Sequence, residues 1–139
     1  MYRNILFIFA CLMTGNAIAA RWTPIANFPQ LSAEIDLDSV VMRVNLVEAI
    51  FRFTYPLPQR SSSSGALYRS AEVTSLFDCK AGTFVPVHRR EFSEPLSQGE
   101  IVGRISLPRE ASKLERIITG SMNEIMHSKA CSISVDGHH

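Results

Sequence analysis

The clearest pattern along the chain is a period-two alternation of apolar and polar residues over Val44–Tyr55. The even positions of this stretch include the charged residues Glu48 and Arg52. The odd positions from 47 onward are all apolar: Val47, Ala49, Phe51, Phe53 and Tyr55. This alternation predicts a β-strand with one face on a core and the other towards water or a partner. Pro56 and Pro58 follow, and we expect them to end the strand because neither can donate a hydrogen bond to a ladder.

Several other segments also have the residue pattern of strands, and short turns join many of them. A serine-rich stretch, Gln59–Gly65, reads as a solvated hairpin loop and not as a catalytic feature, because no fixed base accompanies its serines. Pro86 places its strand at an edge or at a bulge. Strands joined by short turns predict an antiparallel meander. The segments are Leu67–Cys79, Phe84–Phe92 and Ile101–Leu107, with shorter candidates at Trp22–Ile25 and Ala33–Leu37.

The period changes to that of a helix near the end of the chain. Ser112 and Glu115 have the spacing of a capping box, with Ser112 as the N-cap. An amphipathic stripe follows at Leu114, Ile117, Ile118, Met122 and Ile125. Gly120 would cost the helix about 1 kcal/mol relative to alanine, so packing against the sheet must hold it. The pattern predicts an α+β fold, a sheet with one C-terminal helix on it.

The first nineteen residues have the three parts of a secretory signal peptide. Arg3 is followed by an uncharged apolar run, and Ala17 to Ala19 form a small-x-small tripeptide. The apolar run is shorter than the roughly 20 residues that cross a bilayer. We expect cleavage after Ala19. Lipidation of Cys11 after Ala10 is an open alternative, although Phe9 is bulky for a lipidation box.

Residues 20–139 have the size of one domain. Arg3 is the only charged residue of the leader, so the remainder holds thirteen basic and thirteen acidic residues. A chain without basic excess is not expected to bind nucleic acid or other polyanions. No later apolar stretch reaches the length of a transmembrane segment.

Two cysteines remain after cleavage, Cys79 and Cys131. An isolated pair in an oxidising compartment is expected to form a disulfide, and two free thiols are the alternative. On the chain-entropy model a bridge closing this loop stabilises the fold by about 4 kcal/mol. Cys79 ends a predicted strand and Cys131 follows the predicted helix, so the bridge would pin helix to sheet.

No residue pattern predicts a cofactor, and we expect no metal site and no catalytic site. The four histidines are His88, His127, His138 and His139. Asp36 and Asp38 could form a carboxylate pair on a strand, but a turn or strand end explains them as well.

Two surface features could bind a protein. Arg89 and Arg90, with Arg104 in the next strand, could form a basic spot for an acidic partner, or simply a solvated strand face. Leu46 and Ile50 leave the outward face of the first long strand partly apolar, as at an interface. The helix, or the second subunit of a homodimer, could equally cover that face.

The ordered set of segments resembles the bacterial surface-adhesin protein E family. The resemblance covers most of residues 20–139 and implies an antiparallel sheet with one C-terminal helix tethered by a disulfide. The chain differs from the family in two respects: it lacks the usual glycine turn near Met42–Asn45, and it has no well-formed lipidation box. The matching features are Trp22, Ile35–Val40, the strand ending at Pro56, Ser70, Phe77–Lys80, Ser97–Val102 and a terminal helix closing on Cys131.

The best-known relative binds host vitronectin, laminin and plasminogen, so the resemblance implies a host-protein partner. We therefore expect an exported, non-enzymatic binding protein of the bacterial envelope, in the periplasm or on the outer surface. A periplasmic inhibitor or structural envelope protein is the alternative, and a small hydrolase a more distant one.

Overall fold

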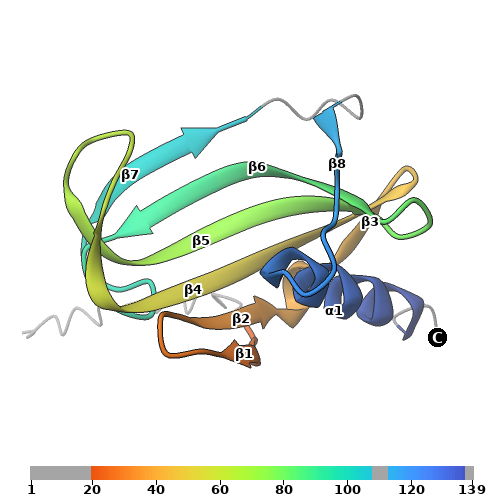
Figure 1. Cartoon of the computed structure of the whole chain (residues 1–139), viewed down its shortest axis with the longest axis horizontal. Coiled ribbons are helices and arrows are strands. Elements are labelled where there is room, and N and C mark those ends of the chain that lie inside the picture. The colour runs from red at the N-terminus through yellow and green to blue at the C-terminus, as the bar shows by residue number, and fades with distance from the viewer. Residues whose placement is uncertain (1–19, 108–112, 137–139) are drawn as a thin grey trace, which may run out of the picture.

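The computed structural model describes residues 20–107 and 113–136 (Figure 1). The predicted leader with Cys11, and also Ser112, His138 and His139, lie outside these residues. No helix in the described part of the chain is long and apolar enough to cross a membrane. The elements are β1 (Trp22–Asn27), β2 (Ser32–Asp36), the 3₁₀ turn η1 (Leu37–Ser39), β3 (Val41–Arg43), β4 (Leu46–Arg60), β5 (Leu67–Asp78), β6 (Thr83–Phe92), β7 (Ile101–Ser106), β8 (Glu115–Arg116) and α1 (Met122–Asp136).

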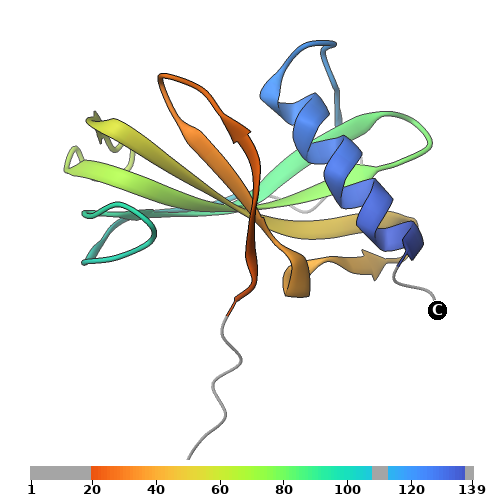
Figure 2. The same ribbon diagram turned by 90° about the horizontal axis from the view of Figure 1, so that it is seen from below.

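The eight strands form one antiparallel sheet, in the order β1-β2-β4-β5-β6-β7, with β3 paired to β4 and β8 to β6. The predicted α+β meander is confirmed. Helix α1 lies across one end of the sheet and leaves the hairpin between β4 and β5 uncovered at the other end (Figures 1 and 2). The core between α1 and the sheet contains Ala33, Ile35, Val47, Ala49, Phe51, Phe53, Val73, Phe77, Phe84, Met126 and Ala130.

Strand β4 does not end at its prolines, so that prediction was wrong. It continues to Arg60, although the pairing with β5 breaks between Thr54 and Gln59. The side chain of Arg69 bridges this break, since its Nε and Nη2 donate to the carbonyls of Tyr55 and Pro56 at 3.2 and 3.1 Å. An arginine thus supplies donors where the prolines lack them.

Helix α1 begins at Met122, later than predicted. The segment before it includes β8, which pairs with Thr83 and Phe84 of β6. Gly120 has φ +81°, a left-handed conformation that excludes it from a right-handed helix. The capping box lies at Ser121, whose Oγ accepts from Glu124 N at 3.3 Å, while Glu124 Oε2 accepts from Gly120 N at 2.9 Å. The capping box predicted at Ser112 and Glu115 was wrong, because Glu115 lies in β8 and the helix starts at Met122.

Pro86 marks a bulge and not an edge. The register between β5 and β6 shifts beside it, between Thr74 and Ser75. Strand β7 pairs with β6 from His88 onward and β8 pairs only at Thr83 and Phe84, so Pro86 lies between these two partners. The edge strands of the main path are β1 and β7. His88 therefore lies on an interior strand.

The connection between β3 and β4 is a two-residue hairpin turn, because Arg43 pairs with Leu46. The first turn residue, Val44, has φ +57°. A β-branched residue is strained in this left-handed region, where glycine is usual. Val44 thus lies in the turn where the family usually has a glycine. It is 93% exposed.

Candidate functional site

The two ends of the sheet carry different groups of side chains. At the helix-covered end, Cys79 and Cys131 form a disulfide with an S–S distance of 2.07 Å and a Cα–Cα distance of 5.8 Å. Cys79 directly follows β5 and Cys131 lies within α1, so the bond ties the helix to the end of a central strand. The predicted tether between helix and sheet is present.

His127 lies beside this disulfide. One of its ring nitrogens and the two sulfur atoms all lie within 4.8 Å of one another. Its Nε2 is 3.2 Å from the carbonyl oxygen of Asp78, and its ring meets that of Phe77 edge to face at a centroid distance of 5.9 Å. The sequence analysis overlooked this group, although His127 and Cys131 stand four residues apart and therefore share one face of a helix.

The same end of the molecule exposes apolar side chains. They come from the β3–β4 hairpin and from the last turn of α1: Met42 is 51% exposed, Val44 93% and Val135 72%. Together with Cys79 and Lys80 they line a hollow of about 720 Å³. We call the surface formed by Met42, Val44 and Val135 the apolar end.

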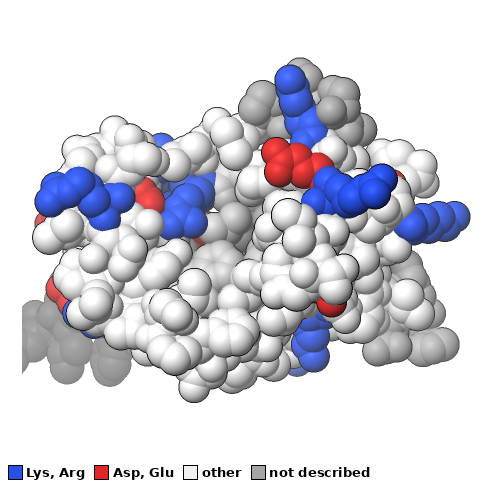
Figure 3. Space-filling view, in the orientation of Figure 1, with Lys and Arg blue, Asp and Glu red and all other residues white. Residues whose placement is uncertain are grey.

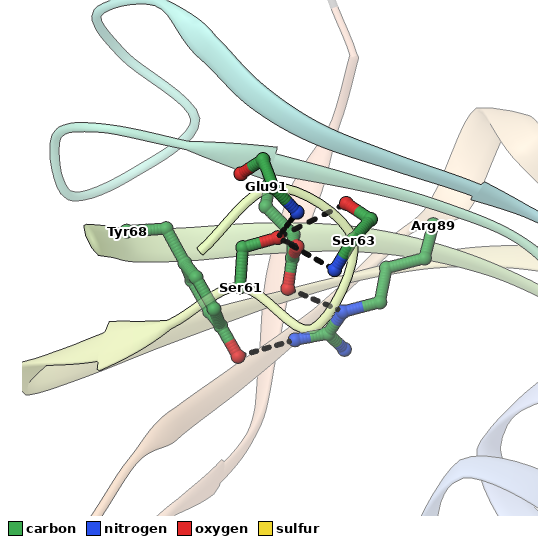
Figure 4. Close-up of polar contacts among 6 residues, drawn as sticks. Ser61, Ser63, Tyr68, Arg89 and Glu91 are labelled. Atoms are coloured by element: carbon green, nitrogen blue, oxygen red, sulfur yellow. Dashed lines mark hydrogen bonds and ion pairs between the residues drawn. The ribbon is translucent and has the colours of Figure 1, made fainter. Parts of the chain in front are cut away.

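At the opposite end, a buried polar cluster fastens the serine loop to the sheet (Figure 4). Glu91 on β6 is only 2% exposed. Its Oε1 accepts a hydrogen bond from Ser61 Oγ at 2.6 Å, and its Oε2 lies 3.1 Å from Arg89 Nε. Arg89 Nη2 donates to Tyr68 OH at 3.0 Å. The prediction that this serine stretch is solvated was wrong for Ser61, which is 3% exposed.

The loop closes around this serine. Ser61 Oγ also accepts from the backbone nitrogens of Ser63 and Ser64 at 3.3 Å, and it contacts Ser63 Oγ at 3.0 Å. Gly103 on β7 leaves the space that the cluster fills, because a Cβ there would overlap Glu91 Oε1 and lie 2.6 Å from Ser61 Oγ. The contacts of Ser61 with Glu91 and with the loop backbone hold the loop on the sheet, so we call this cluster the structural clamp.

Burial and hydrogen bonding together set the pKa values of two residues in the clamp. It raises the pKa of Tyr68, an effect that the positive charge of Arg89 partly opposes. Burial also opposes the charged form of Arg89, but hydrogen bonds to Tyr55 and Glu91 outweigh it and raise the pKa of the guanidinium. Arg89 therefore remains protonated and Tyr68 remains a neutral phenol at neutral pH.

The candidate residues Asp36, Asp38 and His88 each make structural contacts of their own. Asp36 Oδ1 accepts from the backbone nitrogens of Arg21 and Asp38 at 3.0 Å, and Asp38 pairs with the side chain of Arg21 at 2.8 Å. These two carboxylates therefore hold a turn and a strand end, as the alternative explanation had it. His88 Nδ1 contacts Ser106 Oγ at 3.2 Å across neighbouring strands near the surface.

The predicted basic spot does not form as a unit, because neighbouring strand residues point to opposite faces. Arg89 belongs to the clamp, whereas Arg90 pairs with Glu72 at 3.0 Å on the other face of the sheet. Arg104 lies opposite Arg90 in the register and is exposed. Charged groups on the face seen in Figure 3 are accordingly scattered among uncharged side chains.

The outward face of β4 is partly covered by the chain itself. Leu46 packs against a small buried cluster of Leu76, Val85 and Val87, together with Leu114. Leu114 was predicted to lie in the helix, but it packs against this small cluster instead. Ile50 is half-buried on the same face.

Comparison with known proteins identifies the fold and the family. The family model described as surface-adhesin protein E matches residues 22–132. A crystal structure of Haemophilus influenzae protein E in its selenomethionine form aligns with a TM-score of 0.53 at 13% identity, covering 72% of this chain and 78% of that one. A second crystal form of the same protein aligns with a TM-score of 0.50 at 16% identity over 72% and 80%. No curated protein sequence matches the chain.

The structural likeness shows the shared fold, and the family match extends over nearly the whole described chain. The predicted resemblance is therefore confirmed, as is the expectation of export to the bacterial envelope. The chain belongs to the surface-adhesin protein E family, a family of exported bacterial surface proteins.

Proposed function

We propose that this protein is a non-enzymatic adhesin that binds a host extracellular-matrix or plasma protein through its apolar end. The exposure of Val44, together with that of Met42 and Val135 beside it, carries the proposal. Grouped apolar side chains on a protein surface commonly mark a contact with another macromolecule.

The apolar end is held rigid before any partner arrives. The two-residue turn fixes the hairpin that carries Met42 and Val44. The disulfide ties α1, which carries Val135, to the turn after β5. A surface that is already ordered loses little conformational entropy when it binds, which favours affinity.

Basic residues border the apolar surface. Lys80 is exposed in the turn after β5, and Arg43 next to Val44 is 63% exposed in its side chain while paired with Glu48 at 2.9 Å. This combination suits a partner segment with apolar side chains flanked by acidic ones. Complementary charge at the rim would raise the association rate more than the final affinity.

Immobilised exported protein, exposed to vitronectin, laminin and plasminogen, tests the proposal. We expect saturable binding of at least one of them and a loss of about tenfold or more in affinity for Val44→Asp, because a charge would be buried at the contact. Aspartate also tolerates the left-handed backbone better than valine. Leu57→Asp is the matched control, since Leu57 is 73% exposed in the uncovered half of β4.

Unchanged binding by Val44→Asp would refute the role of the apolar end while leaving adhesion standing. Absence of saturable binding to all three proteins would refute host-matrix adhesion. Protease treatment of intact cells supplies an independent check. An adhesin is cleaved under these conditions, whereas complete protection would indicate a periplasmic inhibitor or structural protein.

A further inference from the structure

The disulfide and its neighbouring histidine have the composition of a thiolate–imidazole metal site. Cys79, Cys131 and His127 each place one potential ligand atom within 4.8 Å of the other two. Cys79 is exposed, and the other two residues are half-buried. We propose that, once the disulfide is reduced, these three side chains bind one zinc ion, which then links α1 to the end of β5.

The helix presents two of the three ligands in a fixed relation. His127 and Cys131 lie one turn apart on the same face of α1, because residues four apart are stacked along a helix. Three to five intervening residues are typical of the ligand pair that a helix contributes to a structural zinc site, and three stand between His127 and Cys131. Cys79 supplies the third ligand from the sheet, so the metal would cross-link the same two elements as the disulfide does.

The required rearrangement is small. Two Zn–S bonds of about 2.3 Å at a tetrahedral angle place the sulfur atoms roughly 3.8 Å apart. The sulfurs of the disulfide must therefore separate, while the Cα atoms already stand 5.8 Å apart. Cys79 can accommodate this movement because it is exposed and follows β5, outside its ladder.

A backbone carbonyl oxygen and an aromatic ring fix the orientation of His127. Its Nε2 lies 3.2 Å from the Asp78 carbonyl oxygen. The tautomer that donates this hydrogen bond leaves the lone pair on the other ring nitrogen, and such a carbonyl partner commonly orients a metal-bound histidine. The edge-to-face contact with Phe77, at 71° between ring planes, further limits rotation of the imidazole.

A dithiol can reduce the Cys79–Cys131 disulfide. The dithiol gives two electrons and two protons to the bridge, becomes a disulfide itself, and leaves Cys79 and Cys131 as thiols. Zinc(II) then displaces the two thiol protons and forms two Zn–S bonds and one Zn–N bond. Water would complete the fourth coordination position.

The test titrates the exported protein with cobalt(II) as a spectroscopic probe, after reduction with a dithiol and anaerobic removal of the reductant. We expect one cobalt per chain with sulfur-to-metal charge-transfer absorption, and displacement by zinc. The oxidised protein should give no such absorption. His127→Ala should weaken binding about tenfold or more. His88→Ala, which alters a histidine on the sheet, should bind as the unchanged protein does.

Thermal unfolding keeps the proposal testable if reduction loosens the helix. Zinc should raise the Tm of the reduced protein and leave the Tm of reduced His127→Ala unchanged. Equal cobalt binding by the oxidised protein, or by His127→Ala, would overturn the proposal and indicate adventitious ligation. Replacing His138 and His139 by alanine would then show whether the terminal histidines are responsible. Absence of cobalt binding to the reduced protein would overturn it as well.

Discussion

The two ends of the sheet are held together by different means. At the helix-covered end a covalent bond, Cys79–Cys131, joins elements that are 52 residues apart in the sequence. At the other end a buried carboxylate, Glu91, holds the loop that starts at Ser61 through hydrogen bonds alone. The helix leaves this second end uncovered, as Figure 2 shows, so polar contacts there replace the apolar contacts that a second layer would supply. A small domain can therefore order a loop without a helix over it when the buried charge at the loop is paired.

Removing the covalent link should have the largest effect. Replacing both Cys79 and Cys131 by serine should lower the free energy of unfolding by about 4 kcal/mol, because the unfolded chain regains the entropy of a 52-residue loop. Denaturant unfolding of the variant and of the unchanged protein measures the difference. The unchanged protein after reduction serves as the control and should match the variant when zinc is absent. A loss below about 1 kcal/mol would show that noncovalent packing of α1 suffices.

Removing the carboxylate at the other end should have the next largest effect. Glu91→Ala should cost about 2–3 kcal/mol, since it leaves Ser61 Oγ without its acceptor and the guanidinium of Arg89 without its charge partner. The side chain of Arg89 is 25% exposed, so water relieves part of the penalty.

The neighbouring strand offers a matched control for this variant. Glu72 pairs with Arg90, whose side chain is 37% exposed, and Glu72→Ala should cost less than about 1 kcal/mol. Urea unfolding of both variants makes the comparison. Equal losses for Glu72→Ala and Glu91→Ala would contradict the view that the clamp is energetically distinct. Proteolysis within residues 61–66 should also accelerate in Glu91→Ala only.

The part of the fold that sequence could predict is the part governed by local periodicity. The odd positions of β4 form the core because one face of this strand packs against α1 and the neighbouring strands, and the period-two alternation of apolar residues marks that face. The helix was misplaced because two Ser-x-x-Glu motifs stand close together, at Ser112 and Ser121. Only packing separates them: Gly120 adopts a positive φ, and Leu114 joins the cluster on the far face of the sheet.

The clamp could not be predicted because its members are distant in sequence. Ser61 reads as a loop residue, and only the folded structure brings it to Glu91, thirty positions later. The group around the disulfide is different. The four-residue spacing of His127 and Cys131 is visible in the sequence, and only the nearness of Cys79 required the structure.

The hairpin turn at the apolar end should respond to relief of backbone strain. Val44→Gly should stabilise the protein by about 1 kcal/mol, because glycine adopts φ +57° without the penalty that a β-branched residue incurs. Val41→Gly is the control, since Val41 lies in the extended strand β3 of the same hairpin and glycine weakens strands. Thermal unfolding should move in opposite directions for the two variants. A lower Tm for Val44→Gly would show that the valine side chain makes stabilising contacts despite its exposure.

The smallest effect concerns the titration of Tyr68 in the clamp. Burial raises the pKa of this phenol above its ordinary value of 10.0, so the folded state retains a proton that the unfolded state has lost. The resulting stability is fully present below pH ~10 and decreases as the pH rises further. The unfolding free energy of the unchanged protein should therefore fall more steeply between about pH 9 and pH 11 than that of Tyr68→Phe. If both proteins lose stability in parallel over this range, Tyr68 titrates equally in the folded and unfolded states, and water reaches the clamp more freely than its burial indicates.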